Sequence, residues 1–277
     1  MHRKTQEMID AINNILAEYN DPLTLRQLYY RLVATHVIEN TERAYKALSA
    51  TLTKARRAGL VDAAQIVDRT RRPSRVSCWT DLSAFLETAR RAYRREKWVT
   101  QERCVEVWIE KDALAGVLEP VTKQWEVTLY PCRGYNSYSA LMLAAKRVAK
   151  QDEGRDDHTL VLYLGDFDPS GADMARDIRD RMADDFGATI ELRVLALTGA
   201  QVEAYALPPA PAKRSDTRAA AFIAEHGDRA VELDALPPDA LQDLVRCAIT
   251  ENLDITIWER ECLTEVTEKR DLESLMS

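Results

Sequence analysis

The chain is poor in the residues that build disulfide-bonded or zinc-bound domains. Its 277 residues include only four histidines and five cysteines, and the cysteines are odd in number, scattered and without a CxxC pair. This pattern argues against a zinc knuckle and a disulfide framework, and it fits a reducing cytoplasm. No histidine stands in a recognisable pair with a candidate nucleophile. The cysteines are Cys78, Cys104, Cys132, Cys247 and Cys262.

Long hydrophobic runs and nucleotide-binding loops are also missing. No stretch of about 18 consecutive apolar residues is present, so we expect no contact with a membrane. The first residues, 1–7, are polar and lead into an amphipathic segment and not into an apolar signal core. Neither GxxxxGK[ST] nor GxGxxG occurs, which leaves two common nucleotide-binding sites without support. We therefore expect a cytoplasmic protein.

Charge is divided unevenly along the chain. Residues 1–103 hold 19 Lys and Arg against 12 Asp and Glu, a net charge of +7, whereas residues 104–277 hold 19 against 33, a net charge of -14. A basic first part suits a phosphate backbone, and an acidic second part suits a cation site. The alternative is two solvated surfaces that differ by chance.

The first 60 residues have the apolar spacing of three helices. The first helix carries an apolar stripe from Met8 to Tyr19 and ends at the turn before Pro22. The second begins after Thr24, which with Gln27 three residues later forms a capping-box pattern. The third runs from about residue 40 to Gly59, a typical helix stop.

The third helix has a basic face opposite its apolar one, and an arginine-rich segment at residues 66–76 follows it. Helices in this order, the last one basic, are typical of a helix-turn-helix or winged-helix module, in which the last helix enters the major groove of double-stranded DNA. The segment 66–76 is a candidate wing. The alternative is a helical bundle with an ordinary charged exterior. The candidate DNA-binding residues are Arg43, Lys46, Lys54, Arg57, Arg69, Arg71 and Arg72.

From residue 103 the pattern changes to alternating strands and helices. We predict strands at residues 104–110, 127–130, 159–164 and 190–197, with helices at 111–124, 136–150 and 169–184. Such alternation predicts a parallel sheet covered on both faces. The predicted fold is therefore an α+β protein of two domains, a helical winged-helix-like domain at 1–100 and an α/β domain at 101–277.

Acidic residues follow two of these strands. Glu110 ends the first strand, and Asp166 and Asp168 follow the third, where alternation on an extended chain points them the same way. Chemistry in parallel sheets gathers at the carboxyl ends of strands, and three carboxylates without histidine or cysteine favour magnesium. The alternative is that these acids are simple helix caps. Lys111 could hold a phosphate or pair with a neighbouring carboxylate, and we favour the pairing.

These motifs together resemble a known family. Glu-Lys-Asp-Ala at residues 110–113 and Gly-Asp-Phe-Asp-Pro-Ser-Gly at 165–171 are similar to the Toprim domain of topoisomerase VI A subunits and the related meiotic double-strand-break protein. Residues 195–198 and 231–236 look like the final Toprim strand and the segment after it. Residues 25–30 look like the R-x-x-Y-Y motif of the family's winged-helix-type domain. The resemblance covers most of residues 20–250.

The resemblance and the helix spacing select the same nucleophile. Tyr29 shares the apolar face of its helix, whereas Tyr30 lies about 140° from Leu25 and off that face, with Arg26 one turn before it. The family motif makes its second tyrosine the nucleophile, which is Tyr30. The alternative from the residues alone is a packing tyrosine without a catalytic role.

The resemblance implies magnesium-dependent DNA cleavage by a type IIB topoisomerase A-subunit-like enzyme. Tyr30 would form a 5′-phosphotyrosyl bond, Arg26 would stabilise the phosphate, and Glu110, Asp166 and Asp168 would hold Mg²⁺. It also implies a homodimer that joins the tyrosine of one protomer to the metal site of the other, and nucleoid association in a prokaryote. The chain is shorter than a typical A subunit and lacks the ATPase motifs of the B-type subunit, which would be a separate partner. Two alternatives are a Toprim nuclease that uses metal-activated water and a non-catalytic DNA-binding protein.

Overall fold

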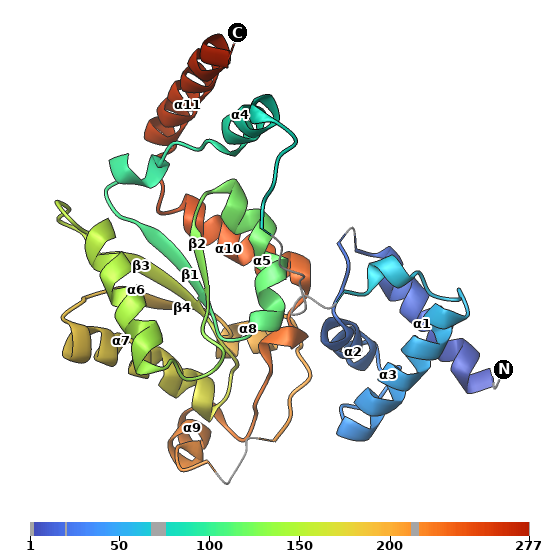
Figure 1. Cartoon of the computed structure of the whole chain (residues 1–277). Helices are drawn as coiled ribbons and strands as arrows, with labels where there is room; N and C mark the ends of the chain where they lie inside the picture. Colours follow the sequence, from blue (N-terminus) through green and yellow to red (C-terminus); the bar gives the residue numbers. More distant parts are fainter. Residues whose placement is uncertain (1–2, 20, 68–75, 212–215, 277) are drawn as a thin grey trace.

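The computed structural model describes residues 3–19, 21–67, 76–211 and 216–276. Over these residues the chain forms an α+β structure with eleven α-helices and one four-stranded parallel sheet (Figure 1). The helices of the first 60 residues lie together at one side of the sheet, as Figure 1 shows in blue.

The first three helices match the predicted ones closely. They are α1 (Arg3–Ala17), α2 (Leu25–Ala34) and α3 (Glu42–Arg57), followed by a short 3-10 turn, η1 (Ala63–Gln65). Thr24 and Gln27 form the predicted capping box at the start of α2, and Thr41 caps α3. Gly59 has a φ of +69°, which an L side chain rarely adopts, and this explains the end of the helix near that residue. Leu23 and Ile66 form an isolated parallel bridge that joins the two ends of the unit.

The predicted parallel sheet is confirmed, with strand ends within two residues of those expected. Its strands are β1 (Val105–Ile109), β2 (Thr128–Pro131), β3 (Leu160–Leu164) and β4 (Glu191–Ala196). They are ordered β2-β1-β3-β4 and all run parallel. Because β1 and β3 are neighbours in register, the residues that follow them emerge side by side at one edge of the sheet.

Helices cover both faces of the sheet. α5 (Asp112–Gln124) and α10 (Pro238–Thr250) lie on one face, and α6 (Tyr138–Gln151) and α7 (Pro169–Phe186) lie on the other (Figure 1). Alternating side chains of a strand join separate hydrophobic clusters: Val107 packs in the cluster with α5 and α10, and Trp108 in the cluster with α6 and α7. Strands buried on two faces explain the nearly continuous apolar sequence of β3.

The cluster on the α5 side of the sheet extends into the N-terminal helices. Buried residues of α1, α2 and α3 belong to the same hydrophobic cluster as Val107, Ile109 and Leu118. The contact is made through η3 (Leu233–Ala235), a 3-10 turn of the C-terminal part that packs against α2. The predicted domain boundary after residue 100 falls just before β1, and the two halves share this core across it.

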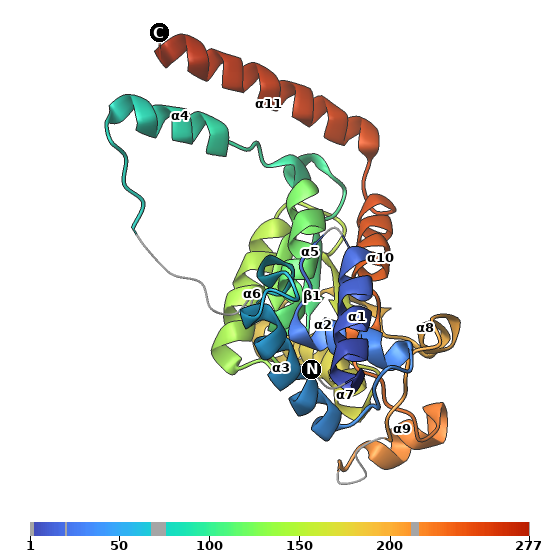
Figure 2. The same cartoon turned by 90° about the vertical axis from the view of Figure 1, so that its right-hand side faces the viewer.

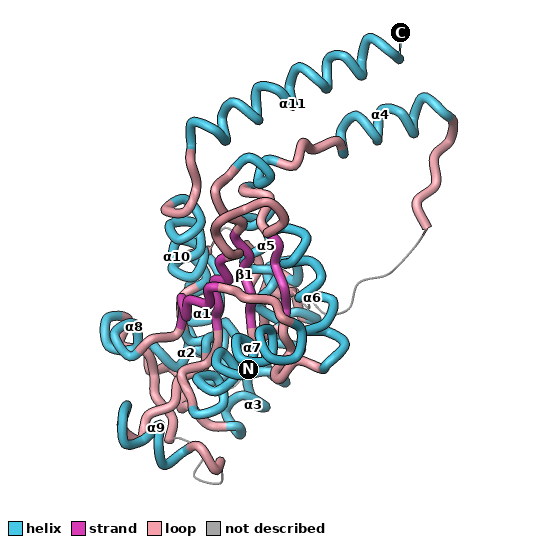
Figure 3. The backbone as a smooth tube through the Cα atoms, turned by 90° about the vertical axis from the view of Figure 1, so that its left-hand side faces the viewer, coloured by secondary structure: helices cyan, strands magenta, loops and turns pink. Residues whose placement is uncertain are grey.

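A pair of helices forms an arm that stands away from the sheet. α4 (Leu82–Ala92) and α11 (Ile255–Met276) lie side by side in Figure 2, and Figure 3 shows them apart from the layer of strands. Lys97, in η2 (Lys97–Thr100) at the base of the arm, is buried and contacts Glu126 at 2.7 Å and Glu265 of α11 at 2.5 Å. The C-terminal helix is therefore anchored to the body by a buried cation.

Two short helices complete the fold beside the carboxyl edge of the sheet. They are α8 (Gly199–Ala204) and α9 (Ala219–His226). Phe167, three residues beyond the end of β3, exchanges two backbone hydrogen bonds with Val231, which ties the segment before η3 to this edge. Among the described residues, no helix has the length and apolar character needed to cross a membrane.

Candidate active site

The three predicted metal ligands emerge at one edge of the sheet. Glu110 follows β1, and its backbone N–H donates to the Leu164 carbonyl at 2.8 Å. Its carboxylate Oε2 accepts the backbone N–H of Asp166 at 2.9 Å. Asp166 and Asp168 are half-buried while Phe167 between them is buried, so the aspartates share one side of the extended chain. Both line a pocket of about 280 Å³.

Asp168 has a structural role besides any role with a cation. Its Oδ1 accepts the backbone N–H of Gly171 at 2.7 Å and so caps α7, whose first residue is Pro169. For Asp168, the alternative that the acids serve as helix caps therefore describes a contact that this structure contains. A Cβ at Gly171 would lie 2.1 Å from the Asp166 carbonyl oxygen, so only glycine permits the chain to turn this tightly beside the acids.

Lys111 pairs with carboxylates, as favoured from the sequence. Its ammonium group lies 2.8 Å from Asp166, 2.6 Å from Glu232 and 2.9 Å from Asp234. Burial lowers the pKa of Lys111, but the surrounding carboxylates outweigh burial and raise it above its ordinary value. Asp166 also accepts the Leu233 N–H at 2.8 Å, so η3 and the acidic edge are held together.

The acidic edge has an excess of negative charge. Burial raises the pKa of Glu110 to about 7, and the nearby Asp166 and Asp168 carboxylates add to this effect. Burial also raises the pKa of Asp166, against the opposing influence of Lys111. In the described part of the chain, no three Asp, Glu, His or Cys side chains are grouped closely enough to hold a metal ion together.

The donor set nevertheless fits a hard cation. Its candidate ligands are all carboxylate oxygens, which suit magnesium. The Tyr163 hydroxyl, whose pKa is raised by burial and then by the Glu110 carboxylate, is buried without a hydrogen-bond partner among the described residues. A cation at this edge would lower the Glu110 pKa, which burial first and the Asp166 and Asp168 carboxylates next keep high. Glu110, Asp166 and Asp168 are the residues that would hold it.

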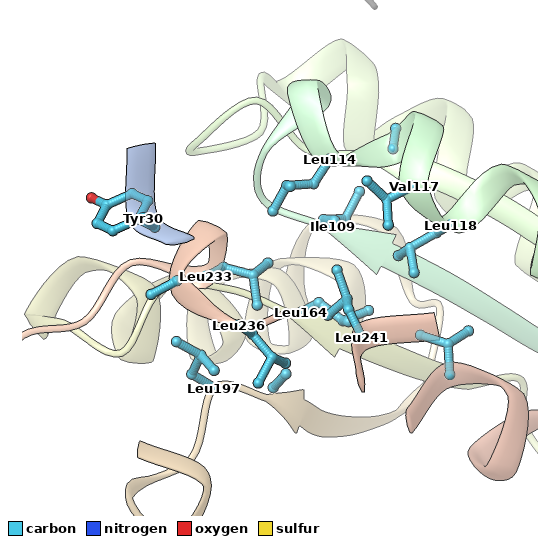
Figure 4. Close-up of a cluster of buried hydrophobic side chains, with 14 of the residues drawn as sticks. Tyr30, Ile109, Leu114, Val117, Leu118, Leu164, Leu197, Leu233, Leu236 and Leu241 are labelled. Carbon is cyan, nitrogen blue, oxygen red and sulfur yellow. The ribbon is translucent and has the colours of Figure 1, made fainter. Parts of the chain in front are cut away.

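Tyr30 is more buried than its position off the apolar face predicts. Its exposed fraction is 6%, close to the 5% of Tyr29. The reason is that α2 is covered twice, by the other N-terminal helices on one side and by η3 on another. Figure 4 shows the Tyr30 ring beside Leu233, with its hydroxyl directed away from the hydrophobic cluster. Tyr30 lines a pocket of about 260 Å³ together with Arg26 and Glu232.

Arg26 lies on the same side of α2 as Tyr30, as predicted from the helix spacing. Its guanidinium pairs with Glu232 through Nη2 and lies 3.4 Å from Asp234 through Nε. Burial, and next the Glu232 carboxylate, raise the pKa of Tyr30, while Arg26 and Lys111 act in the opposite direction. A phenol in this setting needs its cationic neighbours, or a base, to become a nucleophile.

Glu232 and Asp234 were not predicted as site residues. They link Arg26 of α2 to Lys111 after β1, although they lie more than 120 residues from Lys111 in the sequence. A signal was present: two acids two residues apart, the same spacing as Asp166 and Asp168.

The predicted DNA-binding residues of α3 are exposed. Arg43, Lys46, Lys54 and Arg57 all face solvent, and Lys46 pairs with Glu42 at 2.7 Å on the surface. Such a pair contributes little and leaves the lysine available to a phosphate. The candidate wing residues Arg69, Arg71 and Arg72 lie outside the described residues.

Comparison with known proteins gives no independent assignment. No model of a protein family matches the chain, and no curated protein matches it significantly.

Proposed function

We propose that this protein cleaves double-stranded DNA by magnesium-dependent transesterification, as a compact relative of the topoisomerase VI A subunit. In this proposal residues 101–277 include a Toprim domain, and α1–α3 form a winged-helix-like domain. The parallel sheet, the acids at its carboxyl edge and the tyrosine helix beside them support it.

One observation carries the proposal: Glu110, Asp166 and Asp168 lie at the carboxyl ends of neighbouring strands, where burial and then the two aspartates raise the Glu110 pKa. Carboxylates with raised pKa values at the carboxyl edge of a parallel sheet are typical of a site that binds a cation or a substrate. Asp168 caps α7 and Glu110 accepts the Asp166 N–H, so both acids have structural contacts as well. Metal-assisted chemistry on a phosphodiester explains all three.

The chemistry assigned to each side chain follows from its surroundings. The Tyr30 hydroxyl attacks phosphorus, a 5′-phosphotyrosyl bond forms, and the bond to the 3′ oxygen breaks, releasing a 3′-hydroxyl. Arg26 binds the phosphate and stabilises the charge that develops on it. Bound Mg²⁺ would supply charge stabilisation for the oxygens of the reacting phosphate.

The proposal includes partners of defined kinds. The duplex lies on the basic face of α3, where the exposed Arg43, Lys46, Lys54 and Arg57 can contact phosphates. A homodimer supplies two sites, one for each strand. A separate ATPase of the B type would couple cleavage to strand passage.

The test is trapping of the covalent intermediate. Purified protein is mixed with supercoiled plasmid and Mg²⁺ and then denatured with detergent. The wild type should yield protein-linked nicked or linear DNA, and Tyr30→Phe should yield none. Tyr29→Phe is the matched control, because Tyr29 is an equally buried neighbour on the same helix whose hydroxyl bonds Asn40 at 3.0 Å. Full cleavage by Tyr30→Phe would end the tyrosine assignment.

The burial of Tyr30 favours one alternative, a Toprim nuclease that uses metal-activated water. This alternative predicts cleavage without a protein–DNA adduct, retained in Tyr30→Phe and lost in Asp166→Ala. A third outcome, steeply salt-dependent DNA binding without cleavage at any Mg²⁺ concentration, would identify a non-catalytic DNA-binding protein.

A further inference from the structure

The Glu232 carboxylate occupies a position between two cations. It pairs with the Arg26 guanidinium and lies 2.6 Å from the Lys111 ammonium group. The two cations come from separate halves of the chain, Arg26 from α2 and Lys111 from the turn after β1. An anion in this position therefore bridges the N-terminal helices and the sheet.

The two cations do not depend on Glu232 for their positions. Asp234 contacts both, with its Oδ2 at 2.9 Å from Lys111 and 3.4 Å from the Arg26 Nε. Asp166 holds Lys111 from another side at 2.8 Å. Asp234 has a fully buried side chain, whereas the Glu232 side chain is 39% exposed. Glu232 can thus leave toward solvent while the buried carboxylate keeps the cations in place.

The position of the Glu232 carboxylate, between Arg26 and Lys111, lies beside Tyr30, the proposed nucleophile. Arg26, Tyr30 and Glu232 line one pocket of about 260 Å³, together with residues at the start of α3. A carboxylate and a phosphodiester each present two oxygens and one negative charge. The pair of cations that binds the first is therefore suited to the second.

We propose that Arg26 and Lys111 form a preformed binding site for a DNA backbone phosphate, and that the Glu232 carboxylate fills this site in the free protein. DNA binding then requires displacement of Glu232, which acts as an internal competitor. The inference rests on the proposed function for the identity of the anion, and it adds an autoinhibitory contact to that function.

The experiment measures binding of a short fluorescent DNA duplex by anisotropy, in EDTA and at fixed salt. Glu232→Gln keeps the size of the side chain and removes the charge that competes with phosphate. It should bind the duplex about threefold to tenfold more tightly than the wild type, the range for loss of one partly exposed ion pair. Glu203→Gln is the matched control, because Glu203 is an exposed acid that contacts Arg229 at 3.5 Å on the surface, and its affinity should match the wild type.

A second variant separates the specific site from a general charge effect. In an Arg26→Gln background, Glu232→Gln should give no gain, because the cation that the carboxylate blocks is gone. In addition, inorganic phosphate should raise the melting temperature of Glu232→Gln more than that of the wild type. The inference is overturned if Glu232→Gln binds no more tightly than Glu203→Gln, or if its gain persists without Arg26.

The result is separable from the proposed cleavage. Tighter binding by Glu232→Gln, with no covalent adduct from any variant in Mg²⁺, would support the phosphate site and reject the transesterification. Adduct formation by the wild type, with unchanged binding by Glu232→Gln, would support the transesterification and reject the phosphate site.

Discussion

Replacement of Glu110 by glutamine tests the cost of an ionised carboxylate at the acidic edge, which burial and the two aspartates impose. The amide oxygen of the substituted side chain can still accept the Asp166 N–H that Glu110 accepts at 2.9 Å, so the backbone contact is kept while the charge is removed. The folded state holds the Glu110 proton more tightly than the unfolded state does, because burial and the two aspartates raise its pKa from 4.5 to about 7. Ionisation of Glu110 therefore weakens the metal-free fold.

The magnitude follows from that pKa difference. At 1.36 kcal/mol for each pH unit the full effect is about 3 kcal/mol, and partial solvent access reduces it to roughly 1–2 kcal/mol. The penalty is absent below pH 4.5 and grows as the pH rises to about 7. In EDTA at pH 8, Glu110→Gln should therefore melt roughly 2–8 °C above the wild type, at roughly 2–4 °C per kcal/mol for a chain of this size.

Thermal melts at pH 4.5 and pH 8, with EDTA or Mg²⁺, check this expectation. The advantage of Glu110→Gln should disappear at pH 4.5, where the wild-type carboxyl is protonated. Saturating Mg²⁺ should stabilise the wild type, by about 2.7 kcal/mol at a hundred times the dissociation constant, and should stabilise Glu110→Gln less. A variant that is less stable than the wild type in EDTA at pH 8 would refute the argument that ionised Glu110 weakens the fold.

Three further predictions concern other parts of the molecule. Gly171→Ala should lose about 2–5 kcal/mol of stability, because the added Cβ would overlap the Asp166 carbonyl oxygen. A thermal melt measures this loss, and an unchanged melting temperature would contradict the prediction. Lys97→Met should destabilise the protein by about 1–3 kcal/mol, because Glu126 and Glu265 lose a buried cation although Lys269 still pairs with Glu265. Limited proteolysis should then cut α11 early; a protected α11 would count against the anchor. In the proposed homodimer Tyr30 of one protomer acts with Asp166 of the other, so mixing Tyr30→Phe with Asp166→Asn should restore nicking; no restoration would mean that each site uses a single chain.

The regular elements could be predicted because their causes are local. The apolar run before Gly165 predicts a strand buried on two faces, and β3 ends at Leu164 as expected. Thr24 and Gln27 cap α2 through contacts within three residues. The order of the strands makes the ends of β1 and β3 adjacent, which brings Glu110 to Asp166.

Contacts between distant segments could not be predicted in the same way. The spacing of α2 reveals one apolar face, but Tyr30 is buried by η3, which comes about 200 residues later. The ion pairs of Arg26 with Glu232 and Asp234 have the same origin. The apolar spacing of a helix predicts which face packs in the hydrophobic core. It does not predict that a distant segment will also cover a face made of polar and aromatic residues.

Asp234 connects the site chemistry to the packing of the two halves. Its carboxylate is fully buried, its Oδ2 contacts Lys111 and Arg26, and its Oδ1 has no hydrogen-bond partner in the described part of the chain. Burial of a charged group is unfavourable without its partners, so removal of either cation should loosen α2 from the sheet as well as impair phosphate binding. Loss of activity in an Arg26 or Lys111 variant therefore has two causes. Glu232, being partly exposed, is the member of this network whose charge can be removed while the buried ion pairs of Asp234 stay intact.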